Sequence, residues 1–125
     1  MPTRVREKTG LYVHAGPFPP LSEKKYDLIL IVGVLEHAPD QVGFVKEVRS
    51  RMASGGQAMV HCPVIDTVDD VHRLRDLFNP LSHLWMHSSV SMMRLWADVG
   101  LEPKSLGELF GIPRFAFLRE VLVTW

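Results

Sequence analysis

Two ionisable residues, Glu36 and His37, stand just after an apolar run in the segment YDLILIVGVLEHAPD. Histidine changes charge near neutral pH, so His37 is a candidate general base that takes a proton from an acceptor hydroxyl or amine. In the alternative interpretation, Glu36 and His37 only order the turn by hydrogen bonds. Both interpretations require an ordered turn, which the flanking elements have to supply.

Two further histidines, His83 and His87, are four residues apart, a spacing that would put two metal ligands on one face of a helix. Pro80 before the pair and Ser88-Ser89 after it argue against a helix there, and no glutamate lies between the histidines. The sequence therefore predicts no metal site from this pair. We expect the segment HLWMH to form a partly buried loop over a cleft.

The single cysteine, Cys62, follows His61 in the segment QAMVHCPV. Adjacent side chains on a strand point to opposite faces, so His61 is badly placed to activate the Cys62 thiol. We therefore expect a buried structural thiol. A single cysteine forms no internal disulfide and is typical of a reducing compartment, which predicts a cytoplasmic protein.

The apolar run at 28–32, LILIV, positions the Glu36-His37 pair. It does not alternate between apolar and polar residues, which predicts a strand buried on both faces, as in parallel sheets covered by helices. In open α/β sheets, ligands bind at the carboxyl ends of such strands. The pair stands just beyond that end.

A helix and a second strand follow. Apolar residues at helical spacing predict a helix over 41–53 with one buried stripe, and Gly55-Gly56 is predicted to end it. Residues 58–64 are predicted as a strand. A helix between two apolar strands indicates a parallel strand–helix–strand unit. The stripe consists of Val42, Val45, Val48 and Met52.

Weaker patterns predict the remaining elements. Thr67 and Asp70 have the spacing of a capping box, and Ser88 or Ser89 can begin a later helix. The predicted elements are a strand at 11–15, helices at 66–78 and 90–99, and strands at 101–109 and 115–125. The buried stripe predicted for the helix at 66–78 is Val68, Val71, Leu74 and Phe78.

Composition bounds the possible functions. The chain has 125 residues, of which 46% are apolar and 22% charged, which predicts one packed domain over 1–125. Residues 1–10 are polar and basic and are predicted as a flexible terminus. The formal net charge is zero, which favours neither a nucleic-acid partner nor a membrane surface. No apolar run reaches the length that spans a bilayer.

The VLEH turn after its strand, the helix followed by Gly-Gly, and the strand QAMVHCPV together resemble the central part of class I S-adenosylmethionine-dependent methyltransferases. The stretch HLWMHSSVSMMRLWADVGLEP resembles a later helix of that family and the turn into its next strand. The resemblance covers roughly residues 11–125 and only the family's second half. It implies a partial Rossmann-like α/β fold: a mostly parallel sheet with helices on its faces and a C-terminal antiparallel hairpin.

The resemblance also implies where ligands would bind. Relatives that modify quinone precursors hold a metal with an acidic residue three positions before this glutamate. Here that position is Gly33, and two protein ligands make a poor metal site, so no metal is predicted. The acid that contacts adenine in the family is replaced by Gly16-Pro17-Phe18. The implied contacts are Gly16, Gly33, Leu35 and Glu36 for S-adenosylmethionine, Trp85 and His87 for a small-molecule acceptor, and His37 as catalytic base.

The family's glycine-rich first strand and turn do not occur in this sequence. In the implied strand order 3-2-1-4-5-7-6, strand 4 is residues 28–32 and lacks a neighbour on one side, which invites pairing. Residues 11–15 could move into that place, two copies could pair as a homodimer, or a complementing chain could complete the sheet.

Two functions follow from this interpretation. The first is a methyltransferase that methylates a small molecule only when a partner completes it. The second is a non-catalytic methyltransferase-like binding or scaffold module that dimerises through its open sheet edge. Because fold does not imply function, the sequence leaves open whether the chain is an enzyme.

Overall fold

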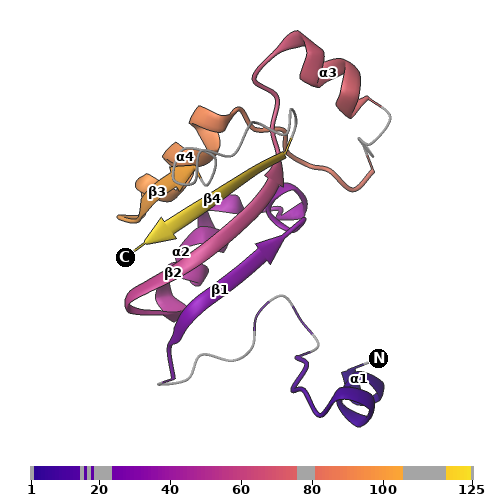
Figure 1. The fold of residues 1–125 in the computed structure, drawn as a ribbon, viewed down its shortest axis with the longest axis vertical. Coiled ribbons are helices and arrows are strands. Elements are labelled where there is room, and N and C mark those ends of the chain that lie inside the picture. The colour runs from indigo at the N-terminus through magenta and orange to yellow at the C-terminus, as the bar shows by residue number, and fades with distance from the viewer. Residues whose placement is uncertain are drawn as a thin grey trace.

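The fold is a mixed four-stranded sheet with helices packed on one face (Figure 1). This computed structural model describes residues 2–14, 16, 18, 24–75, 81–105 and 118–124. In chain order the elements are α1 (Pro2–Thr9), β1 (Tyr26–Val32), the 3₁₀ helix η1 (Leu35–His37), α2 (Gln41–Arg51), β2 (Met52–Pro63), α3 (Val68–Leu74), α4 (Ser89–Ala97), β3 (Glu102–Ser105) and β4 (Leu118–Thr124).

The strands lie in the order β1-β2-β4-β3. Strands β1 and β2 run parallel, with Leu30 opposite Met59, and α2 connects them. Strand β4 runs antiparallel to both β2 and β3. The parallel strand–helix–strand unit and the antiparallel C-terminal strands are therefore confirmed. The order also agrees with the one implied for the second half of the sheet.

One face of the sheet carries the hydrophobic core. Helix α2 lies behind the strands in Figure 1, and the buried residues of α2 and α4 join those of β1, β2 and β4 in one cluster. Burial of this apolar surface is the main favourable term in folding. The buried cluster consists of Ile31, Leu35, Val45, Val48, Met52, Ala58, Val60, Cys62, Val64, Met92, Trp96, Leu101 and Val123.

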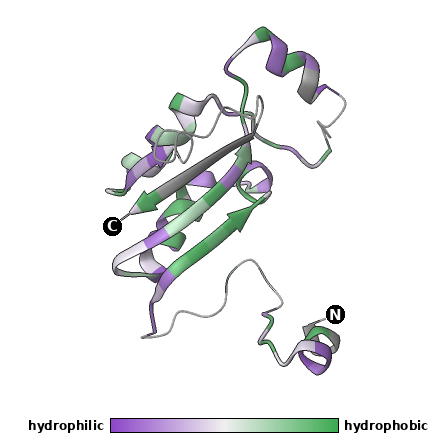
Figure 2. Cartoon of the chain, in the orientation of Figure 1, coloured by the Kyte–Doolittle hydropathy of each residue, from purple (hydrophilic) through white to green (hydrophobic). Residues whose placement is uncertain are grey.

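The opposite face of β1 is bare among the described residues. Leu28, Leu30 and Val32 are 56%, 59% and 60% exposed, whereas Ile31 is 4% exposed. Figure 2 shows β1 apolar along nearly its whole length. The prediction that residues 28–32 are buried on both faces is therefore wrong. An apolar run indicates that both faces of a strand are apolar, but another element has to cover the second face.

Strand β1 is also an edge of the sheet. In the described part of the chain, no segment pairs with its outer side. The strand predicted at 11–15 is not present over 11–14, where Leu11 and Tyr12 are strongly exposed. Residue 15 lies outside the described ranges. Helix α1, which lies within the terminus predicted to be flexible, stands apart from the sheet (Figure 1).

The glycine pair after α2 has a different role from the predicted one. Helix α2 ends at Arg51, ahead of Gly55-Gly56, so the pair does not stop the helix. A Cβ at Gly56 would lie 2.8 Å from the Ala53 carbonyl oxygen and 3.0 Å from that of Tyr26, and Gly55 has φ +72°. The pair lets β2 pass close to β1 where their register shifts.

Both predicted helix starts are confirmed. Thr67 and Asp70 form a capping box at α3, and Ser88 and Ser91 form one at α4. In each box the first side chain accepts a hydrogen bond from the backbone three residues on, and the third helical residue bonds back to the cap. Local capping chemistry therefore decides where these two helices begin.

The predicted buried stripe of α3 is wrong for Val68 and Val71, which are 73% and 49% exposed. The side chains of Leu74 and Phe78 lie outside the described residues, as do residues 106–117 and 125 of the two predicted C-terminal strands. No helix in the described ranges combines the length and apolar composition needed to cross a membrane.

Asp70 makes the start of α3 sensitive to acid. Burial acts to raise the pKa of Asp70, but the hydrogen bonds that its carboxylate accepts from Asp66 and Thr67 outweigh it and lower the pKa below 3.8. Because the folded-state pKa is the lower one, the cap stabilises α3 above the ordinary pKa and is lost as pH falls through the folded value. We expect NMR titration of the Thr67 amide to give a midpoint below 3.8.

The variant Asp70→Asn should lack this titration, since an amide does not ionise in this range. The variant Thr67→Ala keeps the carboxylate and is the matched control: its acid transition should remain. A wild-type midpoint at or above 3.8 would contradict the hydrogen-bonded cap.

Candidate functional site

The turn after β1 directs one acid inward and one imidazole outward. Gly33 has φ +60°, which favours glycine, and its N–H donates to the His61 carbonyl oxygen at 3.1 Å. The chain then enters η1, where Leu35 is fully buried and Glu36 is 4% exposed. The side chain of His37 is 39% exposed. The predicted site residues 33–37 are therefore together at the carboxyl end of β1.

A loop from far along the chain is fastened over this turn. The backbone N–H groups of Leu84 and Trp85 donate to the Glu36 carbonyl oxygen at 2.9 and 3.3 Å. The Trp85 indole Nε1–H donates to the Ala38 carbonyl oxygen at 2.8 Å. Residues 81–86 are not helical, which confirms the loop predicted for this region. The loop and the turn form one hydrogen-bonded unit.

The imidazole of His37 is held in one tautomer. Its Nδ1 lies 2.6 Å from the carbonyl oxygen of Ser82. A carbonyl oxygen can only accept, so Nδ1 carries a proton, and in the neutral imidazole the lone pair is on Nε2. Nε2 lies 3.9 Å from Glu36 Oε1. An unprotonated, partly exposed Nε2 is what a general base needs.

The loop also brings His83 to the pair. The rings of His37 and His83 have centroids 4.7 Å apart at an interplanar angle of 37°. Glu36 Oε2 is buried and has no hydrogen-bond partner in the described part of the chain. The sequence did not predict that His83 lies beside Glu36 and His37. The only pattern near His83 in the sequence was its four-residue spacing to His87.

His87, predicted to contact an acceptor, is only 8% exposed and has a polar contact at each ring nitrogen. Gln41 Nε2–H donates to His87 Nε2 at 2.8 Å, and Ser91 Oγ lies 3.4 Å from His87 Nδ1. Burial lowers the pKa of His87, although the charge of Glu36 opposes this. His87 is therefore a neutral residue that joins α2 to the loop. Trp85, the other predicted contact, is 44% exposed.

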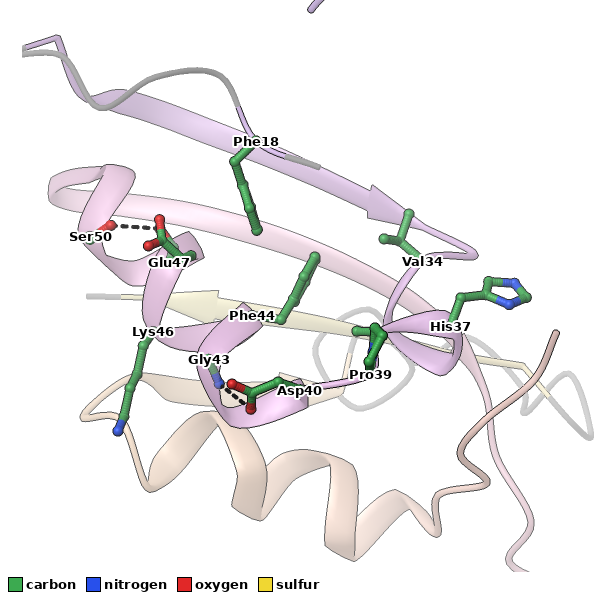
Figure 3. Close-up of a pocket in the computed structure, with 11 residues that line it drawn as sticks. Phe18, Val34, His37, Pro39, Asp40, Gly43, Phe44, Lys46, Glu47 and Ser50 are labelled. Carbon is green, nitrogen blue, oxygen red and sulfur yellow. Dashed lines mark hydrogen bonds between the residues drawn. The ribbon is translucent and has the colours of Figure 1, made fainter. Parts of the chain in front are cut away.

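A surface groove of about 950 Å³ runs from His37 along α2 (Figure 3). The rings of Phe18 and Phe44 point toward one another and pack together in its wall, with centroids 5.1 Å apart. The remaining apolar wall comes from Val34, Ala38 and Pro39, and polar groups come from Asp40, Lys46, Glu47 and Ser50. Gly16 is not among the lining residues. The groove therefore has an aromatic wall formed by Phe18 and Phe44, and it also reaches His37.

The aromatic wall was missed by sequence reasoning. The predicted stripe of α2 included Val42, which is 50% exposed and not buried. Phe44 is half-buried and packs against the core instead. A search for aromatic residues just outside the stripe would have found it.

The Cys62 thiol is buried, as predicted. Burial and then the charge of Glu36 raise the pKa of Cys62 from 9.0 to about 12. We expect the native protein to react with a disulfide reagent at pH 8 at least ~100-fold more slowly than in denaturant, because the reactive species is the thiolate. The variant Cys62→Ser is the blank. Equal rates in the two conditions would contradict the burial of this thiol.

This strand–helix–strand unit, with its polar turn at the carboxyl end of a parallel strand, defines a Rossmann-like α/β domain, and that end is where such sheets bind ligands. A family model described as "Methyltransferase domain" matches residues 4–106, so the chain belongs to that methyltransferase family. The resemblance seen in the sequence is thereby confirmed.

Individual relatives are distant. The chain is 22% identical over 79 residues to a tRNA U34 carboxymethyltransferase of Nautilia profundicola, which covers 63% of this chain and 26% of the relative. The corresponding enzyme of Campylobacter fetus is 27% identical over 75 residues, with 59% and 27% covered. The chain therefore spans about a quarter of the length of these relatives.

Solved structures share the fold. A S-adenosylmethionine-dependent methyltransferase of Thermotoga maritima has a TM-score of 0.71 at 19% identity, covering 98% of this chain and 68% of that one. A methyltransferase of Haloferax volcanii, in complex with a methyltransferase activator, has a TM-score of 0.71 at 14% identity, covering 99% and 67%. At these identities the likeness shows the fold alone.

Membership of the family implies S-adenosylmethionine as cofactor, and the groove fits part of it. The Phe18–Phe44 wall suits a flat adenine ring. The charged amino-acid end of the cofactor needs cationic or polar partners. Within the described ranges, the basic residue lining the groove is Lys46, which Figure 3 shows directed away from it. The described residues thus fit the adenosyl part and not the amino-acid end.

Proposed function

We propose that this chain is the acceptor-side half of a S-adenosylmethionine-dependent methyltransferase, which methylates a small molecule only when a partner completes the sheet. Two observations on β1 carry the proposal in this member of a methyltransferase family: its outer edge is unpaired among the described residues, and one of its faces is bare. Leu28, Leu30 and Val32 present an apolar face directly beside the Glu36-His37 turn. Exposed apolar patches of this kind mark interfaces.

The chain's own residues have defined roles in this proposal. His37 accepts the proton of an acceptor hydroxyl or amine at Nε2, while the Ser82 carbonyl holds Nδ1–H and keeps the ring oriented. Trp85 lies on the fastened loop and shapes the acceptor side. The cofactor supplies an electrophilic methyl group when bound, and alignment of the two reactants provides most of the rate gain.

Calorimetric titration with S-adenosylmethionine tests the proposal. We expect no binding to this chain alone at millimolar cofactor. A chimera in which this chain is joined to the part of the Thermotoga maritima neighbour that it does not cover should bind in the micromolar range. In the chimera, His37→Ala should lower turnover by roughly 100-fold and leave cofactor binding unchanged. A folded chimera that binds no cofactor, or a lone chain that turns over, would overturn the proposal.

The bare β1 edge also favours a second candidate, a non-catalytic module that dimerises. Backbone groups on the outer side of β1 are unpaired among the described residues, and two copies can pair edge to edge about a two-fold axis. Light scattering of the lone chain should then give twice the mass of one chain. A single-chain mass across a tenfold concentration range would exclude this candidate.

A further inference from the structure

We propose that Glu36, His37 and His83 form a binding site for a divalent transition-metal ion of the zinc type. One ligand atom from each residue lies within 4.8 Å of the other two. Small side-chain rotations close this spacing to metal–ligand bonds of about 2.0–2.2 Å. Two imidazoles and one carboxylate on one side of a cation, with the other positions open, are the ligands of catalytic zinc and non-haem iron sites.

The imidazole of His37 is already prepared for metal binding. A metal-ligating histidine usually donates its other ring N–H to a carbonyl or carboxylate, which orients the ring and raises its basicity. His37 Nδ1–H does this with the Ser82 carbonyl oxygen at 2.6 Å. In the neutral imidazole the lone pair is therefore on Nε2, the atom that lies 3.9 Å from Glu36 Oε1.

Glu36 supplies an independent observation. It is only 4% exposed, and its Oε2 has no hydrogen-bond partner in the described part of the chain. A buried carboxylate oxygen without a partner carries a large desolvation cost, which a bound cation offsets. Glu36 is thus distinct from the exposed acidic groups that cluster on many surfaces without a ligand.

The third ligand comes from the distant loop. His83 lies between Ser82, which binds His37, and Leu84, whose N–H donates to the Glu36 carbonyl oxygen at 2.9 Å. Both neighbours of His83 in the chain are therefore bonded to the turn that carries the other two ligands. This fastening lowers the ordering cost of binding, because the loop is in place before the ion arrives.

The ligand chemistry selects the ion. Nitrogen ligands suit Zn²⁺, Co²⁺ and related ions, whereas Mg²⁺ prefers an all-oxygen octahedron and keeps its waters. The side chain of His37 is 39% exposed, so open coordination positions face the solvent at the end of the groove. An ion there would bind an acceptor hydroxyl or a water. It would also occupy the lone pair of His37 Nε2, so the base role proposed above belongs to the ion-free chain. The inference does not depend on methyl transfer.

Calorimetric titration of the tag-free chain with Zn²⁺ tests the site. We expect one equivalent to bind with a dissociation constant in the micromolar range or tighter, and Mg²⁺ to bind much more weakly. His83→Ala should weaken Zn²⁺ binding at least about tenfold. His72→Ala is the matched control, because His72 is exposed on α3 and away from the cluster. Its affinity should equal that of the wild type.

Two further measurements keep the test decisive if His83→Ala misfolds. The near-isosteric Glu36→Gln should weaken Zn²⁺ binding by a similar factor, and Co²⁺ added to the wild type should give visible absorption bands of a nitrogen-ligated ion. Unchanged Zn²⁺ affinity in a folded His83→Ala variant, Mg²⁺ binding as tight as Zn²⁺, or no Zn²⁺ binding at millimolar concentration would overturn the proposal.

Discussion

Replacement of Trp96 by alanine is expected to lower the free energy of unfolding by about 3–5 kcal/mol. Trp96 is fully buried on the face of α4 that joins the core, and among the described residues it is the largest fully buried side chain. Alanine would leave a cavity between α4 and the sheet. A domain of this size has about 5–15 kcal/mol of stability in total, so urea denaturation should show a protein close to unfolding.

Trp96→Phe is the matched control. The indole Nε1–H of Trp96 is buried and has no partner within the described part of the chain. A buried polar group without a partner destabilises the folded state by about 1–3 kcal/mol. Phenylalanine removes this group and keeps most of the apolar volume. We therefore expect the loss for phenylalanine to be less than half of that for alanine. Equal losses would mean that the indole N–H is bonded in solution.

Ile31→Ala is expected to lower the free energy of unfolding by about 2–5 kcal/mol, whereas Leu30→Ala should change it by no more than ~0.5 kcal/mol. The two residues are adjacent on β1 and differ mainly in how much of the side chain is buried. Ile31 faces the core and is 4% exposed, while Leu30 faces away and is 59% exposed. Denaturation of both variants at equal protein concentration measures the difference.

The stability losses of Leu30→Ala and Ile31→Ala also show whether another chain covers the bare face of β1. If a second copy or a complementing chain covers the outer face of β1, Leu30 becomes buried and its truncation weakens that association. A large loss at Leu30 in the lone chain, dependent on protein concentration, would contradict a bare outer face. The same variant in the chimera described above should then show what covers it.

Local patterns predicted most of the elements. The parallel strand–helix–strand unit followed from an apolar run, a helical stripe and a second apolar run, because these periodicities depend on neighbours in sequence. Thr67 was predicted as a cap, and Ser88 as one of two candidates with Ser89, for the same reason, since a cap bonds to backbone three residues away. The prediction of a buried Cys62 used only the alternation of side chains along a strand.

The errors arose where a pattern depends on something outside its own segment. Val68, Val71 and Val42 have helical spacing, yet they are exposed, because burial requires a facing element and the described chain offers none there. Gly55-Gly56 was assigned to a helix end, but the close approach of β1 and β2 is what requires small residues at that place.

The sequence by itself determined helices α2, α3 and α4, the parallel pair of strands and the position of Glu36 and His37 just past β1, because capping, periodicity and turn chemistry act within a few residues. Only the tertiary structure decided which face of β1 is covered and that His83 meets Glu36 and His37. Those contacts join segments that are far apart along the chain. Their formation depends on the loop bonded to the turn, and no local pattern encodes it.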